Sequence, residues 1–586
     1  MQISLTQALL IAFAAYVGVS PWVCGVGYFT VYRPLIGGTI VGLILGDVRQ
    51  GVVFGAALNA VYLGFVSTGG TLPSDLVMAG YTGTALALAS GLNVDVALAT
   101  FGIPLGVLGG FLWFGRMTLG SWLVHWADHF AAQGDARGVA AINLWAGQGV
   151  LFLFYTLPTF VIVYLGQWGL DRVLALIPDR LIAALSVVGG LLPAVGIGLL
   201  LRSLGKWRLL PYFTIGFLLI TYFDLPILVV SLLGACAAWL SIGALPKTEP
   251  VQAEDVPRSI PGMSGHLPRR VLRAAWWRWA MFLHASYNYE RLQGLGFAHT
   301  LKPVIEHLYT TTRERAAALK RHLVFFNTEP QIGALVPAVI ITMEEERAAG
   351  AAISDETING VKSGLMGPLA GVGDSLFQGM IVPLLLSLGI GLAQDGSLVG
   401  PIVYAIVISA LVLGTSYAFW SLGYRLGKTA VTRILASGWL QAVTDGASIV
   451  GMAVVGGLAA TVVQFSTPAS IQVGQAVVSI QTDLLDAILL GLLPRMWTAG
   501  VWWLLNRGTS PLRVIGFLFV IGIDLTYLGL AGGASPPLFS SEWLRFVIGG
   551  PGTTPRSALL HLWPPLLATL SAVMVVLVRR NARSKN

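Results

Sequence analysis

Long apolar stretches without a single charged residue dominate this 586-residue chain, and they constrain its fold more than any other feature. Leu181–Leu201 and Leu398–Tyr424 are two of them, and a helix that crosses a bilayer needs about 20 apolar residues. Only 11% of the residues are charged, whereas soluble domains carry about 25%. The 71 glycines fit transmembrane helices that pack closely or are interrupted. The sequence therefore predicts an all-α polytopic membrane protein with broken or re-entrant helices.

Two apolar stretches of the first half, Pro34–Gly46 and Gly51–Phe65, are too short to cross a bilayer alone. A charged tetrapeptide joins them, so we expect a re-entrant hairpin or a broken pair of helices. A glycine-rich polar turn follows and ends at Asp75, and irregular backbone at membrane depth should line a cavity. Further on, Leu209–Leu245 is expected as one apolar span.

The composition changes at residues 247–268, which are polar, carry both charge signs and contain four prolines. This is typical of a linker. It separates a membrane domain at residues 1–246 from a second membrane domain at residues 269–535. A C-terminal segment at residues 536–586 adds one more apolar span and a basic tail. The basic, aromatic segment Arg269–Arg321 fits either an amphipathic membrane-interface segment or a solvated helix pair. With the linker in the cytoplasm, six spans of the second half return the basic C-terminus to the cytoplasm, as the positive-inside rule requires.

The stretch Gly364–Gly379 combines five glycines with Pro368, Asp374 and Gln378 in an otherwise apolar run. Pro368 removes one helical hydrogen bond, and the glycines allow close backbone approach. We therefore expect a broken helix here. A carboxylate inside the membrane is a functional-site hypothesis by default, and a glycine-packed helix interface with a satisfied Asp374 is the alternative.

Motifs of soluble enzymes are missing from the sequence, which has no GxxxxGK[ST], no HExxH and no CxxC, so we expect no metal and no cofactor. What remains is a set of polar side chains within apolar sequence: Asn59, Ser67, Asp75, Asp374, Gln378, Asp445 and Asp524. Carboxylates and amides bond sugar hydroxyls, while aromatic rings cover the apolar faces of the sugar. The same carboxylates could couple transport to protons or Na⁺. These side chains alone leave both uses open.

Four long motifs of the second half occur in one order: HASYNYERLQGLGF (His284–Phe297), RHLVFFNTEP (Arg321–Pro330), GVKSGLMGPLAGVGDSLFQG (Gly360–Gly379) and TDGASIVG (Thr444–Gly451). Together they resemble the IID component of the mannose-family sugar phosphotransferase system (PTS). The first half resembles the IIC component of the same family, through YRPLIGGTIVGLILGDVRQG (Tyr32–Gly51) and GAALNAVYLG (Gly55–Gly64). The chain is thus similar to a natural IIC–IID fusion.

The resemblance implies a mechanism. IIC and IID form the membrane channel, while separate IIA and IIB proteins carry phosphate from phosphoenolpyruvate on histidines, and IIB phosphorylates the sugar as it emerges. This chain would then hold no phosphoryl-carrying residue, so whether it counts as an enzyme stays open. Family members assemble as trimers, which implies a homotrimer in the bacterial inner membrane, with linker and C-terminus in the cytoplasm. An ion-coupled secondary sugar transporter that uses an intramembrane carboxylate is the alternative function.

The resemblance also implies site residues in the second half. The motif YNYERLQ supplies the expected sugar contacts, which are Tyr287, Asn288, Glu290 and Gln293. Arg291 is expected to pair with an acid, and capping of a helix start is the alternative role for this cluster. Gating or structural roles at broken helix ends are expected for Asp374, Gln378, Asp445 and Asn327.

In the first half, the candidate sugar contacts are Thr30, Asn59 and Ser67. Mannose-type members have an acidic residue at the position of Asn59. In this chain an uncharged amide, which can donate as well as accept hydrogen bonds, therefore replaces a carboxylate. The substrate is therefore expected among hexoses and amino sugars of the mannose, fructose, sorbose and N-acetylgalactosamine class.

Overall fold

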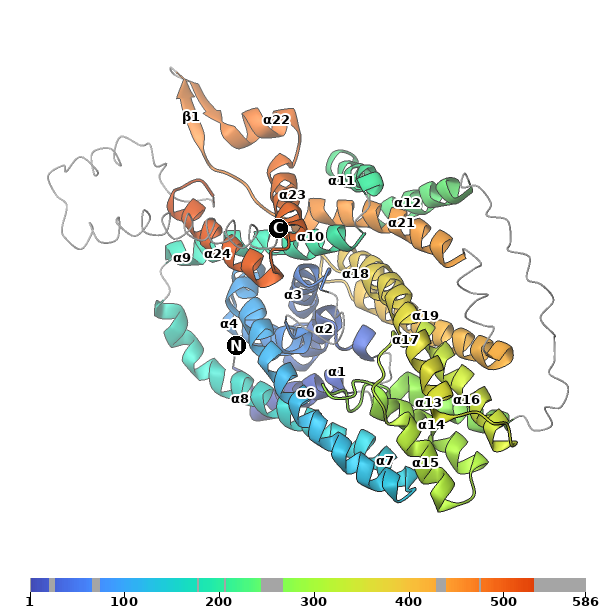
Figure 1. Cartoon of the computed structure of the whole chain (residues 1–586). Helices are drawn as coiled ribbons and strands as arrows, with labels where there is room; N and C mark the ends of the chain where they lie inside the picture. The colour runs from blue at the N-terminus through green and yellow to red at the C-terminus, as the bar shows by residue number, and fades with distance from the viewer. Residues whose placement is uncertain are drawn as a thin grey trace.

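The computed structural model describes residues 2–20, 27–65, 74–176, 179–204, 207–243, 267–427, 439–473 and 476–531. Helices make up nearly all of this part of the chain (Figure 1). Three parts of the prediction lie outside the described residues. They are most of the linker, Ser67, and the whole of segment 536–586 with its expected span Ser557–Val578.

The first half is built from helices whose lengths vary widely. In chain order they are α1 (Leu5–Val19), α2 (Pro34–Leu45), α3 (Val48–Val61), α4 (Thr84–Ser90), α5 (Val94–Ala97), α6 (Ile103–Ala132), α7 (Ala136–Ala141), α8 (Gly147–Leu176), α9 (Asp179–Leu191), α10 (Pro193–Leu204), α11 (Leu210–Phe223) and α12 (Ile227–Gly243). A 3₁₀ turn at Gly27–Phe29 precedes α2, and π turns at Met78–Gly83, Leu98–Gly102 and Ile142–Ala146 run directly into α4, α6 and α8. α11 and α12 replace the single span expected at Leu209–Leu245, because the chain turns at Asp224, which has a positive φ of 48°.

The hairpin predicted at Pro34–Phe65 is confirmed, as α2 and α3. Pro34 occupies the first turn of α2, Gly46 ends it with a φ of 88°, and the Asp47 side chain caps α3 by accepting from the backbone N–H of Gln50. The two helices touch through glycines, because a Cβ on Gly38 would lie only 2.6 Å from the carbonyl oxygen of Gly51. Small residues let membrane helices approach at backbone distance.

The second half starts with a polar helical region and continues with apolar helices. Its elements are α13 (Arg269–Phe282), α14 (Gly294–Leu308), α15 (Thr312–His322), α16 (Leu335–Ala348), α17 (Asp355–Leu376), α18 (Val382–Gly391), α19 (Val399–Leu426), α21 (Trp439–Val462), β1 (Ser470–Val473), β2 (Ala476–Ser479), α22 (Asp486–Ile488), α23 (Leu492–Asn506) and α24 (Pro511–Tyr527). β1 and β2 form a small antiparallel hairpin. Its eight strand residues are an exception to the all-α prediction.

The glycine-rich stretch is not broken at Pro368, contrary to the prediction. α17 contains Pro368 in its interior and continues through a π turn at Phe377–Ile381 into α18. Three of its glycines, Gly364, Gly367 and Gly371, are exposed, and a Cβ on any of them would meet no atom within 4 Å. The glycines therefore mark an uncovered helix face, and the irregular backbone comes one turn later, at the π turn.

Five helical segments of the described chain are long and apolar enough to cross a membrane: Val94–Ala132, Ala136–Gly166, Arg180–Arg202, Asp355–Gly391 and Val399–Arg425. Ile480–Ile488 and Leu492–Asn506 would form a sixth span with a bend of 71°. The predicted polytopic membrane architecture is confirmed. The described part of the second half has fewer full-length spans than expected, since several of its helices are short or bent.

The two halves interlock. α9 packs against α24, α10 against α23, and α11 and α12 against α21, so the last helices of the first half lie beside the last described helices of the second half (Figure 1). The contact is close, because a Cβ on Gly216 of α11 would collide with the backbone carbonyl of Ala453 in α21. The chain is therefore one packed body, and a site can take residues from both halves.

Candidate functional site

A cavity of about 140 Å³ lies between the two halves. At roughly 10–15 Å³ for each water this space corresponds to on the order of ten waters, close to the dozen or so heavy atoms of a hexose. Its polar and aromatic lining comes from α1, the 3₁₀ turn and α6 of the first half, and from α13, two loops, α17 and α19 of the second: Ser20, Tyr28, Tyr32, Trp113, Arg116, Trp279, His284, Tyr287, Gln293, Asn327, Thr328, Gln331, Asp374, Gln378 and Ser416.

The first-half wall is mostly aromatic. Tyr28 stacks on Tyr32 with ring centroids 5.0 Å apart, and the Arg116 guanidinium lies 4.2 Å from the ring centroid of Trp113. The Tyr32 hydroxyl is buried, and no described residue forms a hydrogen bond with it. Such a wall offers faces on which a sugar ring can lie and polar atoms that a sugar can satisfy.

The second-half wall depends on Gln293, whose side chain holds two loops together. Its Nε2 donates to the carbonyl of Thr328 at 2.7 Å, and its Oε1 accepts from the Thr328 N–H at 2.9 Å. Nε2 also lies 3.0 Å from His284 Nε2. Burial and the Arg116 charge lower the pKa of His284 to about 4, so this imidazole is neutral near pH 7. The preceding residue, Leu292, has a φ of 48°, a conformation that costs energy in a non-glycine residue and is kept only where the surroundings enforce it.

The loop held by Gln293 carries a buried acid, Glu329. Its two carboxylate oxygens accept from the backbone N–H groups of Gln331 at 3.0 Å and Ile332 at 2.8 Å, at the start of a 3₁₀ turn. Burial raises the pKa of Glu329 to about 8. Gly373 of α17 makes room for it, because a Cβ there would lie 2.5 Å from Glu329. The side-chain oxygen of Gln331 is buried without a partner, so a second polar atom of a lining residue is available to a ligand.

The cavity brings together five predicted residues: Tyr287, Gln293, Asn327, Asp374 and Gln378. The Tyr287 hydroxyl donates to Asn327 Oδ1 at 2.9 Å, and Gln378 Nε2 donates to Asp374 Oδ1 at 3.2 Å. Gln378 lies in the π turn, an irregularity that often occurs at functional sites.

Three other residues of the YNYERLQ motif do not line the cavity. Asn288 ties its own loop, because its Oδ1 accepts from the backbone N–H groups of Glu290 and Arg291 at 3.1 and 2.9 Å. Arg291 pairs with Asp128 of α6 through two hydrogen bonds of 2.7 Å. Glu290 lies beside Arg291 and 3.3 Å from His125, also on α6. These residues connect the two halves at the edge of the cavity.

The predicted first-half contacts also lie apart from the cavity lining. Asn59 is fully buried, and its Oδ1 accepts from the Leu35 N–H at the start of α2 at 3.2 Å, while its Nδ2 has no partner. Thr30 is buried next to the 3₁₀ turn. Asp445 lies within α21 and is not among the residues that line the cavity.

The sequence interpretation missed Trp113 and Arg116. The apolar run Leu98–Gly115 ends just before Arg116, and a charge at such a point indicates the end of a span, whereas α6 continues to Ala132. Aromatic and basic residues three apart lie on one face of a helix, and this spacing is the signal that could have identified them.

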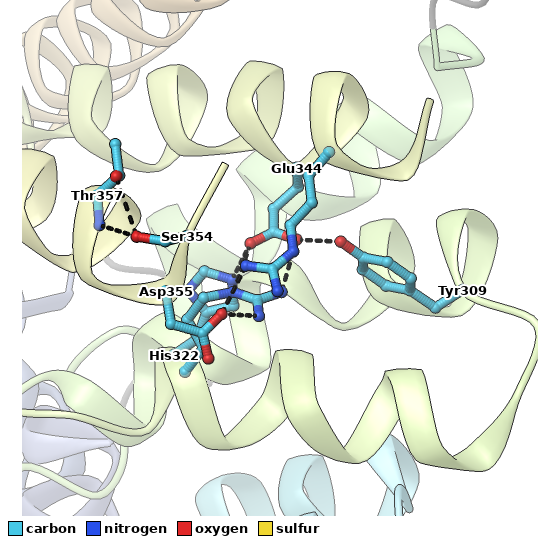
Figure 2. Close-up of polar contacts among 8 residues, drawn as sticks. Tyr309, His322, Glu344, Ser354, Asp355 and Thr357 are labelled. Carbon is cyan, nitrogen blue, oxygen red and sulfur yellow. Dashed lines mark hydrogen bonds and ion pairs between the residues drawn. The ribbon is translucent and has the colours of Figure 1, made fainter. Parts of the chain in front are cut away.

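A second polar cluster joins α15, α16 and α17 (Figure 2). Glu344 accepts from Arg321 through Nε and Nη2 at 2.9 Å each, from His322 Nε2 at 2.9 Å and from the Tyr309 hydroxyl. Arg321 also reaches Asp355, at the start of α17, at 2.8 Å. Glu344, Arg321 and His322 are all buried, so this cluster anchors the helices that carry the Glu329 loop and Asp374.

Two family models match the chain. One describes the sorbose-specific IIC component of the PTS and matches residues 5–240, and the other describes the IID component of the PTS mannose/fructose/sorbose family and matches residues 266–531.

Within the described residues, no group of three or more His, Cys, Asp or Glu side chains is arranged to hold a metal ion.

Named relatives match each half separately. The mannose-specific EIID component of Escherichia coli K12 is 41% identical over 253 residues, which is 42% of this chain and 89% of that protein. The N-acetylgalactosamine permease IIC component 1 of the same organism is 31% identical over 236 residues, 40% of this chain and 86% of that protein.

Among solved structures, a chain of the cryo-EM complex of the mannose transporter ManYZ with microcin E492 is 38% identical, covering 46% of this chain and 99% of its own length, with a TM-score of 0.27. The match to these relatives runs through nearly all of both halves. This chain therefore belongs to the mannose/fructose/sorbose family of PTS permeases, with a IIC component in its first half and a IID component in its second.

Proposed function

We propose that the cavity between the halves is the sugar-binding site of this PTS permease. The chain is a sugar-transporting membrane component of a phosphoenolpyruvate-dependent PTS, and its partners are therefore a sugar, a IIA and a IIB protein. The observation that carries the proposal is the composition of the cavity: one wall of aromatic residues from the IIC half faces polar side chains from the IID half. Two buried polar atoms of lining residues, in Tyr32 and Gln331, are left for a ligand to satisfy.

The site holds its polar groups in a fixed arrangement. Gln293 bonds to both backbone groups of Thr328, Tyr287 bonds to Asn327, and Gln378 bonds to Asp374. A ligand therefore meets preorganised donors and acceptors, which reduces the entropy that binding must overcome. By the names of its relatives, the substrate class is a hexose or amino sugar such as mannose, fructose, sorbose or N-acetylgalactosamine.

The function is tested by uptake of labelled sugars in cells or vesicles that contain this chain, its cognate IIA and IIB proteins and the general phosphotransfer proteins. We expect sugar phosphate to accumulate only when phosphoenolpyruvate and all the partners are present. Accumulation of free sugar by the purified chain under a proton or Na⁺ gradient alone would instead establish the ion-coupled secondary transporter. Gln293→Ala should lower uptake at least tenfold, whereas the exposed Gln394→Ala serves as the matched control and should not.

We also propose that the chain assembles as a homotrimer in the bacterial inner membrane, with the linker and the C-terminus in the cytoplasm. The uncovered glycine face of α17 supports this assembly, since it would allow close packing of a second helix. Native mass spectrometry in detergent gives the number of copies, and a reporter fused to the C-terminus gives its side. A monomer, or a reporter active only outside the cytoplasm, would contradict the respective part.

A further inference from the structure

Arg116 is a buried cation in the cavity wall, and none of the described residues provides it with an acidic partner. Its side chain is only 7% exposed, and no carboxylate of the described residues lies within ion-pair distance of it. Its guanidinium lies over the Trp113 ring and beside Tyr155. Burying a charge is unfavourable unless an opposite charge and hydrogen bonds compensate for it.

Asp75, the acid bonded to Tyr155, is already committed to other donors. Asp75 accepts from the Tyr155 hydroxyl through Oδ2, and from the backbone N–H groups of Val77 and Met78 through Oδ1 at 2.9 and 3.0 Å. Tyr155 therefore stands between the carboxylate and the guanidinium. The remaining side of Arg116 faces the cavity.

The surroundings of Arg116 supply further groups that suit an anion. Tyr32 and Arg116 both line the cavity, and among the described residues the Tyr32 hydroxyl has no hydrogen-bond partner. A guanidinium and a phenol O–H are both donors, and the planar arginine side chain matches the two oxygens of a carboxylate. The acceptors of the cavity, Asp374 and Gln378, lie on α17 and its π turn in the IID half, where they would bond hydroxyl or amino groups.

We infer that the sugar taken by this permease carries a carboxylate, as a hexonate or a hexuronate does, and that Arg116 selects it. The inference rests on the proposed function of the cavity as a sugar-binding site, and it assigns a sugar acid as substrate in place of the neutral hexoses and amino sugars named for the relatives. A carboxylate directed to Arg116 and Tyr32 neutralises the buried cation and stays away from Asp374, so the charges also fix the orientation of the ligand. A neutral hexose would leave the guanidinium without a direct ion-pair partner among the described residues.

The test is equilibrium binding to the purified full-length chain in lipid nanodiscs, followed by intrinsic tryptophan fluorescence, since Trp113 lines the cavity. The probes are D-glucose, D-gluconate and D-glucuronate, and binding requires no phosphorylation and no partner protein. At least one of the two acids should bind at least tenfold more tightly than glucose. High salt should weaken binding of the acid more than binding of glucose.

Variants then separate Arg116 from the rest of the protein. Arg116→Gln should lower affinity for the acid at least tenfold and leave the weaker glucose affinity within about twofold, and Arg116→Lys should retain part of the preference. The control is Arg137→Gln on α7, which removes an exposed cation and should change neither affinity. The comparison of sugars on the unaltered protein does not depend on whether the variants fold.

Equal or tighter binding of glucose by the unaltered protein overturns this inference and leaves the sugar-transport function intact. A preference for the acid that persists in a folded Arg116→Gln variant overturns the role of Arg116. Absence of binding for all three probes, together with failure of the phosphoenolpyruvate-dependent uptake described above, overturns the assignment of the cavity itself.

Discussion

Glu344 at the centre of the buried polar cluster offers the clearest test of how the IID half is held together. Its side chain is fully buried and accepts hydrogen bonds from Arg321, His322 and Tyr309 (Figure 2). Glu344→Gln keeps the shape of the side chain but removes the charge and places an NH₂ group against donors. Arg321 is then left with Asp355, whose side chain is 46% exposed, as its only acidic partner among the described residues.

The expected cost follows from the burial of the pair. Removing one partner of a buried ion pair leaves an uncompensated charge and typically destabilises a protein by about 3–5 kcal/mol. Burial by itself would raise the pKa of Glu344, but the hydrogen bonds and charges of His322 and Arg321 outweigh it and hold that pKa well below its usual range. A carboxyl with a depressed pKa contributes stability above its unfolded-state value of 4.5 and loses it as the pH falls below that value.

The assay is thermal unfolding of the purified chain in detergent at pH 7 and at pH 4, with tryptophan fluorescence as the signal. Since about 1 kcal/mol shifts the midpoint by roughly 2–4 °C in domains of 150–250 residues, Glu344→Gln should lower the midpoint at pH 7 by about 5 °C or more. The difference from the unaltered protein should shrink at pH 4. Glu346→Gln, on the same helix and only half-buried, is the control. A Glu344→Gln midpoint no lower than that of the control would refute the reasoning.

Three other predictions follow from single contacts. Gly51→Leu should prevent the α2–α3 hairpin from closing, because any Cβ at this position meets the backbone of Gly38, and the measure is the yield of monodisperse protein. Reversing the pair Arg291–Asp128 in one double variant should restore part of the stability that either single change removes, with a coupling of about 1 kcal/mol for this partly exposed bidentate pair; no coupling in the cycle would contradict it. Glu329→Gln should flatten the pH dependence of stability between pH 4.5 and 8. In the folded protein the pKa of Glu329 is raised to about 8, so the folded state keeps a proton that the unfolded state loses above pH 4.5, and the stability of the unaltered protein falls as the pH rises through this range. An unchanged slope in the variant would count against this prediction.

Local patterns in the sequence were sufficient where neighbouring residues determine the structure. The α2–α3 hairpin could be predicted because Pro34, Gly46 and Asp47 start and end the two helices, and these signals lie within the segment itself. Part of the second-half wall was predicted through the resemblance of continuous motifs to the IID family. Gln293 lies in a continuous motif, and its hydrogen bonds fasten loops of the same half.

The remaining site could not be predicted from either half alone. Charged residues such as Asp128 indicate a loop when only the surrounding sequence is considered, because an unpaired charge is costly within an apolar span. In the structure α6 continues through this region as a helix, since Arg291 of the other half neutralises Asp128. Arg116, at the end of an apolar run, indicates a loop for the same reason although it lies within α6. The glycines of α17 were misjudged differently, because a run of glycines does not reveal whether a neighbouring backbone covers it or, as here, leaves it open.

Asn59 shows how an amide in apolar sequence can be assigned to either of two roles. It was a candidate sugar contact, but its Oδ1 accepts from the N–H of Leu35, one of the donors that a helix start leaves without an intrahelical partner. A carboxylate at this position would serve the helix start equally well, since the N-terminal end of a helix favours negative charge. Asn59→Asp should therefore retain the fold and leave the order of preference among tested sugars unchanged, whereas Asn59→Leu should lower thermal stability because the donor loses its acceptor. A changed order of preference in a folded Asn59→Asp protein would place this side chain in contact with the sugar in some step of transport.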